Sequence, residues 1–64
     1  MSYTKRELCE CAHAALRQRR SGYPDLVRSG RMKSRVADEQ IAKMEAIYRV
    51  LIKLDDKEIE RAQG

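Results

Sequence analysis

Cys9 and His13 are the residues whose types and spacing could hold a metal ion or form a nucleophile–base pair. Residues four apart lie on one face of a helix, so a thiolate and an imidazole would project side by side. A zinc site needs three or four protein ligands, however, and Cys11 falls on a different face. His13 is the only histidine. We therefore predict no metal, no cofactor and no catalytic residue, and both cysteines as reduced thiols.

The sequence gives equally weak support to other kinds of catalytic site. The carboxylates alternate with basic residues, which is typical of solvated helix faces rather than of the apolar pockets that tune an acid or base. The stretch "SGYPDLVRSGRMKS" lacks the glycine and lysine spacing of a phosphate-binding loop. We predict that the protein is not an enzyme.

The segment between residues 17 and 35 is the strongest candidate for a binding site. It carries seven basic residues and one aspartate, a net charge of +6, whereas the whole chain carries +4 and the remainder therefore −2. Such a cluster could contact phosphates without selecting a base sequence, although only Tyr23 is there to stack on a base. The residues of this nucleic-acid alternative are Arg17, Arg19, Arg20, Arg28, Arg31, Lys33 and Arg35.

The same segment also mixes apolar side chains with arginines, as protein interfaces do. Tyrosine and arginine are common binding hot spots, and a small modulator or inhibitor of a larger protein would present them in this way. We favour this function over nucleic-acid binding. The predicted partner-binding residues are Tyr23, Leu26, Val27, Arg28, Arg31 and Met32.

Two helices and a connector are expected to position these residues. Thr4 and Glu7 form a capping box that begins a helix over about residues 5–20, and Gly22 and Pro24 are expected to end it. Residues 21–33 are predicted as a structured connector. A second helix is predicted over about residues 34–62, with Ser34 as its N-cap, because neither glycine nor proline interrupts it. Like-charge pairs predict fraying of its last two turns.

The expected fold is a single all-α domain, a helical hairpin with a long second helix. At about 1.5 Å per residue the helices would measure about 24 and 42 Å, so the first could not cover the second. An uncovered apolar stripe marks an interface, and we expect a homodimer that forms a four-helix bundle. The predicted dimer interface comprises Met44, Ile47, Tyr48, Leu51, Ile52 and Leu54.

The amino-terminal stretch "MSYTKRELCE" is charged where a signal peptide would be apolar. No apolar run approaches the roughly 20 residues of a membrane-spanning helix. We therefore expect a cytoplasmic protein without membrane contact.

The central stretch "YPDLVRSGRM....ADEQIAKMEAI" resembles small uncharacterised proteins of phages and prophages of proteobacteria. Their pattern is Tyr-Pro-x-x-Val-x-x-Gly-(Arg/Lys)-(Met/Leu), then Ala-Asp, then Ile-x-x-Met-x-x-Ile. Those proteins often have Ser or Thr after the Met/Leu, where this chain has Lys33. The resemblance implies a phage accessory protein in a bacterial host that modulates a host or phage protein. The matching residues are Tyr23, Pro24, Val27, Gly30, Arg31, Met32, Ala37, Asp38, Ile41, Met44 and Ile47.

Overall fold

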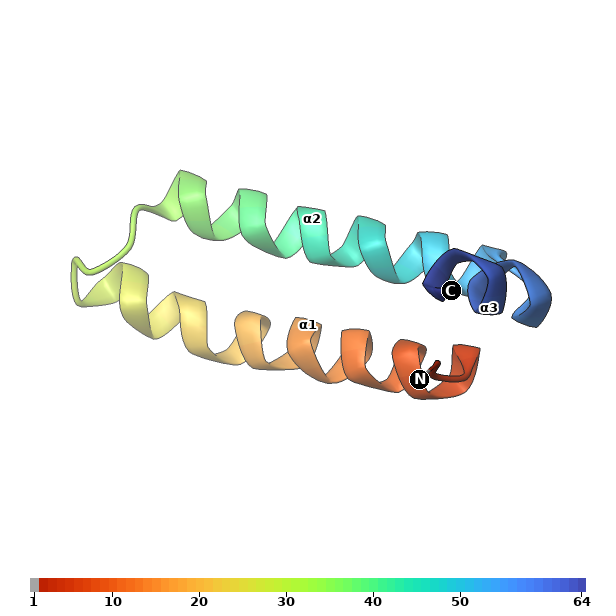
Figure 1. Ribbon diagram of the computed structural model, residues 1–64. Helices are drawn as coiled ribbons and strands as arrows, with labels where there is room; N and C mark the ends of the chain where they lie inside the picture. The colour runs from red at the N-terminus through yellow and green to blue at the C-terminus, as the bar shows by residue number, and fades with distance from the viewer. Residues whose placement is uncertain (1) are drawn as a thin grey trace.

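The computed structural model describes residues 2–64, which form three helices and no strand (Figure 1). α1 spans Lys5–Arg28, α2 spans Ser34–Lys53 and α3 spans Asp56–Gln63. α1 and α2 run side by side in opposite directions, and α3 crosses the end of the hairpin that holds both chain termini (Figure 1). The predicted all-α hairpin is confirmed, and it forms a rod of 43 × 16 × 16 Å.

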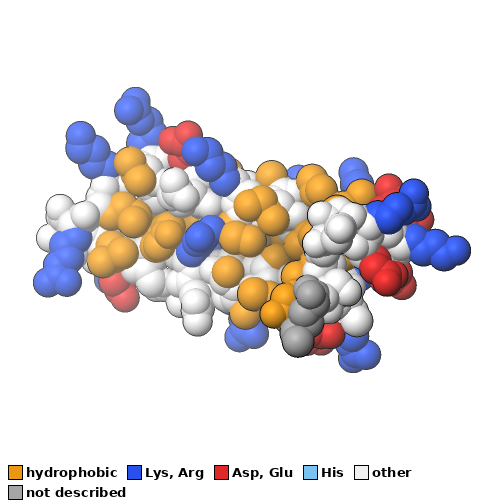
Figure 2. Space-filling model, viewed as in Figure 1, with side chains coloured by type: hydrophobic (Ala, Val, Ile, Leu, Met, Phe, Trp, Pro, Cys, Tyr) orange, Lys and Arg blue, Asp and Glu red, His pale blue; other side chains and the backbone are white. Residues whose placement is uncertain are grey.

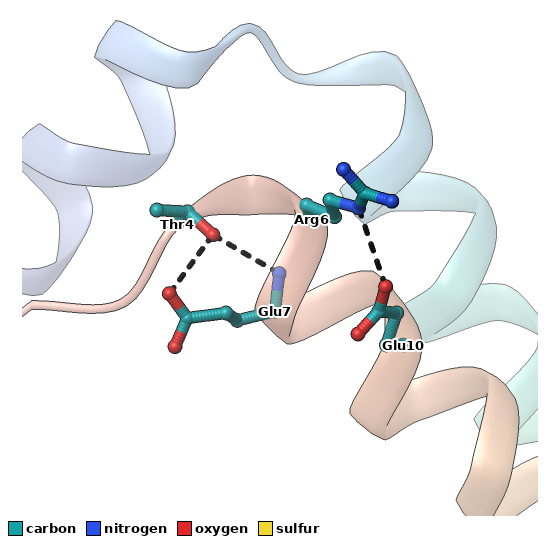
Figure 3. A network of polar contacts seen from close by, with 4 residues as sticks. All are labelled: Thr4, Arg6, Glu7 and Glu10. Atoms are coloured by element: carbon teal, nitrogen blue, oxygen red, sulfur yellow. Dashed lines mark hydrogen bonds and ion pairs between the residues drawn. The ribbon is translucent and has the colours of Figure 1, made fainter.

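α1 begins where the sequence predicts. The Thr4 hydroxyl accepts a hydrogen bond from the Glu7 backbone N–H at 3.1 Å, which satisfies one of the unpaired donors of the first turn (Figure 3). The Glu7 carboxylate accepts from the same hydroxyl at 3.1 Å. Arg6 and Glu10 form an exposed ion pair one turn further on, at 3.3 Å (Figure 3).

The predicted end of α1 near residue 20 is wrong. The helix continues through Gly22 and Pro24 to Arg28, although proline cannot donate the hydrogen bond that the carbonyl of Arg20 would accept. Tyr23 and Leu26 continue, at helical spacing, the row of apolar side chains of α1 that faces α2, and both are half-buried. Their packing explains why tertiary contacts outweigh the local helix-breaking signals.

Gly30 ends α1 by taking a left-handed backbone conformation just after the last turn of the helix. Its φ of 77° is the left-handed conformation that glycine adopts without a steric penalty. The N–H of Gly30 donates to the carbonyl of Val27, and the N–H of Arg31 donates to the carbonyl of Leu26. These two bonds make a Schellman motif. The connector is therefore residues 29–33 and not the predicted residues 21–33.

The second predicted helix is divided into two. Lys33, not Ser34, is the N-cap of α2, and it makes no side-chain capping bond. α2 ends at Lys53, because Leu54 takes an extended conformation. Asp55 then caps α3 with a complete capping box: its carboxylate accepts from the Glu58 N–H at 2.7 Å, and the Glu58 carboxylate accepts from the Asp55 N–H at 3.2 Å. The last turns are thus a separately capped helix instead of a fraying end.

The end of the hairpin with the termini is closed by polar contacts over one buried side chain. Ile59 of α3 is only 3% exposed. The Gln63 side-chain amide donates to the carbonyl of Tyr3 at 2.8 Å and accepts from the N–H of Tyr3 at 2.7 Å. Lys5 Nζ donates to the carbonyl of Ile52 at 2.8 Å, which satisfies an acceptor in the last turn of α2. α3 is therefore anchored to the start of α1.

The core of the hairpin is small. The buried apolar residues are Ala12, Leu16, Ala37 and Ile59. Two packed helices leave both sides of their seam open, so most of the remaining apolar stripe is only half-buried. Figure 2 shows apolar side chains gathered in a band along the seam, with most charged side chains at its edges.

Candidate functional site

The Cys9–His13 pair is not part of a polydentate site among residues 2–64. Both cysteines are free thiols, Cys9 half-buried and Cys11 exposed. The His13 ring lies beside the ring of Tyr48, with centroids 5.5 Å apart. Residues 2–64 contain no group of three or more side chains placed to hold a metal ion. His13 therefore serves as a packing contact between α1 and α2.

The tip of the hairpin brings the predicted partner-binding residues together. Tyr23, Leu26 and Val27 lie on the last two turns of α1, half-buried toward α2. Met32, on the connector, is also half-buried, and its N–H donates to the carbonyl of Leu26 at 3.2 Å. Arg31 is exposed beside them. The tip is thus a small apolar surface bordered by arginine.

The predicted basic cluster is less concentrated than its sequence suggests. Because α1 extends to Arg28, Arg17 lies about 17 Å along the helix from its end, at 1.5 Å per residue. Arg19 is half-buried on the same part of α1. The basic residues that remain at the tip are Arg28, Arg31, Lys33 and Arg35.

Ion pairs further reduce the charge available to an anionic ligand. Arg28 contacts the Asp25 carboxylate at 2.6 Å, and Arg20 contacts the Glu45 carboxylate of α2 at 2.7 Å. Arg49 contacts the other oxygen of Glu45 at 2.8 Å. Among residues 2–64, the basic side chains of the segment without an ion pair are Arg17, Arg19, Arg31, Lys33 and Arg35.

The predicted dimer residues do not share one surface. Met44, Tyr48 and Leu51 recur at helical spacing on the side of α2 that faces α1, and all are half-buried. Ile47 and Ile52 are 51% and 47% exposed. Five residues of helix separate them by about 140°, so they lie on opposite sides of the seam. Leu54 is half-buried at the C-cap of α2.

The expected reason for the uncovered stripe is also corrected. α1 has 24 residues and α2 has 20, so the first helix is long enough to cover the second. The apolar surface that stays exposed lies along the sides of the seam between α1 and α2, because no further element among residues 2–64 packs over the middle of the hairpin. The largest exposed apolar side chains are Tyr3, Val36, Ile47, Val50 and Ile52.

Sequence reasoning missed the polar contacts that hold α3. The D-x-x-E spacing of Asp55 and Glu58 is a variant of the capping-box signal and could have revealed the second helix start. No local pattern indicates the contacts of Gln63 with Tyr3, which are 60 residues apart.

No helix among residues 2–64 is both long and apolar enough to cross a membrane. Comparison of the chain with protein-family models, curated proteins and solved structures found no match.

Proposed function

We propose that the protein is a non-catalytic accessory protein that binds a larger protein and modulates or inhibits it. The observation that carries this proposal is the amount of open surface. A compact 7.4 kDa monomer is expected to expose about 4,200 Å², whereas this chain exposes 5305 Å². Apolar side chains form a band on one face of this surface (Figure 2). Apolar surface in this amount is typical of chains that function in complexes.

We propose that this chain binds the larger protein through the hairpin tip. Tyr23, Leu26, Val27 and Met32 supply an apolar surface that is already ordered, which lowers the entropic cost of binding. Arg31 has no ion pair among residues 2–64 and is positioned to meet a carboxylate on the partner. The resemblance to phage proteins makes a host or phage protein in the bacterial cytoplasm the proposed partner.

A quantitative affinity capture from a bacterial lysate tests the tip. Wild type is compared with Arg31→Glu and with Lys57→Glu, an equal charge change on the exposed surface of α3. We expect a partner that the Arg31 variant loses and the Lys57 variant retains. Equal capture of every protein by all three chains would contradict the proposed tip site.

We further propose that the protein acts as a homodimer in which two hairpins form a four-helix bundle. The excess exposed surface of about 1,100 Å² per chain exceeds the roughly 800 Å² that each partner contributes to a standard interface. Analytical ultracentrifugation at micromolar concentration checks this, and sedimentation as a monomer alone would contradict it.

Nucleic-acid binding is the alternative, and the cations of the tip without ion pairs favour it. Arg31, Lys33 and Arg35 are all exposed. Three phosphate contacts give a log–log salt slope of about −2.7, so affinity should fall about 40-fold between ~50 and ~200 mM salt. Fluorescence anisotropy with duplex and single-stranded oligonucleotides measures this. No binding at the lower salt concentration would eliminate the alternative.

A further inference from the structure

The two sides of the helical seam differ in chemical character. We call the buried and half-buried positions at which α1 and α2 pack against each other the seam positions. In an antiparallel pair of helices, the residue directly after each seam position lies on one side of the seam in both helices. The residue directly before each seam position lies on the other side. The Arg20–Glu45 ion pair joins two residues of the first kind across the seam. The helical spacing places Asp38 and Arg49 on that side as well, and we term it the charged face.

The opposite side, which we term the apolar face, consists of residues that precede the seam positions. On α2 it presents Val36, Ile47 and Val50, which are 41%, 51% and 57% exposed. Lys43 also lies in its α2 portion, where it forms an ion pair with Glu39 at 3.3 Å. In the middle of α1, the residues on the apolar face are small or uncharged. They are Cys11, Ala15, Gln18 and Gly22.

We propose that the apolar face binds a second copy of the chain and that the two hairpins lie antiparallel, with their tips at opposite ends of the dimer. This inference rests on the dimer proposed above and adds its interface and its orientation. A nearly uncharged apolar face can pack against its own copy, since few like charges would be opposed. A nucleic acid would instead require a cluster of cations, whereas Figure 2 shows mainly apolar side chains in this band with few Lys or Arg side chains among them.

Charge favours opposite ends. The segment of residues 17–35 carries +6, so a parallel dimer would place two such segments together. In an antiparallel dimer with each α3 outside the contact, the tips are separated by about 31 Å, which is the 43 Å rod less the roughly 12 Å length of α3. This is several times the Debye length of about 8 Å at physiological salt. Each tip then lies near the partner's terminal end. Residues 53–64 at that end carry four acidic and three basic side chains, a net charge of −1, so they oppose the tip less strongly than a second basic tip would.

The position of α3 gives a second, independent reason. α3 crosses in front of the terminal end of the seam, on the side where the apolar band is visible (Figures 1 and 2). A parallel dimer would press α3 against the α3 of its partner and wedge the two apolar faces apart. An antiparallel dimer places one α3 at each end, beyond the tip of the other hairpin, so the faces can meet.

The consequence for function is a molecule with two identical ends. Each tip, with Arg31 and Met32, would remain accessible at its own end of the bundle. One dimer would therefore bind two copies of a partner about 31 Å apart, instead of presenting one joint basic surface.

The interface is tested with two isoleucines of α2 that have nearly equal exposure. Sedimentation equilibrium compares wild type with Ile47→Glu, on the apolar face, and Ile52→Glu, on the charged face. We expect at least a tenfold rise in the dimer dissociation constant for the first variant and little change for the second. Circular dichroism confirms that both remain helical. Disruption by Ile52→Glu with no effect of Ile47→Glu would overturn the assigned interface.

The orientation is tested with a spin label at the hairpin tip. The full-length chain carries Ser29→Cys as the only labelling site, because Cys9→Ala and Cys11→Ala remove the two native cysteines. The unlabelled background must first sediment as wild type does. Pulsed electron resonance should then give tip-to-tip distances near about 31 Å, the 43 Å rod length less the roughly 12 Å of α3, and added salt should weaken the dimer. Distances of about 10–20 Å, the range for stacked helix layers, would overturn the orientation but leave the dimer. A monomeric wild type would overturn both.

Discussion

Gly22 and Gly30 are chemically identical residues with opposite energetic roles. Gly22 lies inside α1, and a Cβ added there would meet no atom within 4 Å. Gly30 has a φ of 77°, which disfavours any residue with a Cβ. The first glycine is therefore a cost to helix stability, and the second is a requirement of the Schellman turn that reverses the chain.

Alanine substitutions at the two glycines should change stability in opposite directions. We expect Gly22→Ala to raise the free energy of unfolding by about 0.5–1 kcal/mol, because alanine has the higher helix propensity. Gly30→Ala should lower it by about 1 kcal/mol, because the left-handed conformation is strained. Urea unfolding followed by circular dichroism measures both, and a stabilised Gly30 variant would contradict the turn geometry described above.

At the scale of elements, the correct predictions rest on local signals, although the local capping box of Asp55 and Glu58 was missed. The Thr4 cap of α1 and the start of α2 at Ser34 depend on signals within a few residues, and both were predicted. The end of α1 was not, because Gly22 and Pro24 oppose the helix locally while Tyr23 and Leu26 favour it only through packing against α2. Propensity is a weak prior when a helix has an apolar face to bury.

The candidate site followed the same rule. The tip residues were predicted together and do meet, since they are near in sequence. The basic cluster was predicted as one group, but Arg17 and Arg20 are separated from the tip once α1 is two turns longer, and Arg20 is bound by Glu45. Side-chain partners 25 residues away cannot be inferred from a net charge.

The division between α2 and α3 can be tested at the capping box. Asp55→Ala should lower the free energy of unfolding by about 1 kcal/mol, because the Glu58 N–H loses its acceptor. Asp56→Ala removes the same charge one residue later, in the first turn of α3, and serves as the matched control. We expect the control to cost only about 0.3–0.5 kcal/mol through the helix dipole. Equal losses for the two variants, measured by urea unfolding, would show that charge alone stabilises this start.

At the scale of the whole molecule, the shape of the chain is unusual for its size. Its radius of gyration is 14.2 Å, whereas a compact domain of this length is expected near 10.7 Å. A single layer of contact between two helices buries little, and the buried apolar set is limited to four side chains in residues 2–64. The proposed dimer would bury more of this apolar surface and so help to offset the conformational entropy of the chain.

The proposed dimer predicts that thermal stability varies with protein concentration. For a folded dimer in equilibrium with unfolded monomers, mass action adds about 1.4 kcal/mol per tenfold rise in concentration, which corresponds to about 3–6 °C in Tm for a dimer of this size. Circular dichroism melts at about 5 and 50 μM should therefore separate by several degrees. Ile47→Glu should lower the Tm and reduce this separation more than Ile52→Glu, because only the first places a charge on the apolar face. Coincident wild-type melts over this range would mean that the hairpin is stable as a monomer, and its open seam would then need a different occupant.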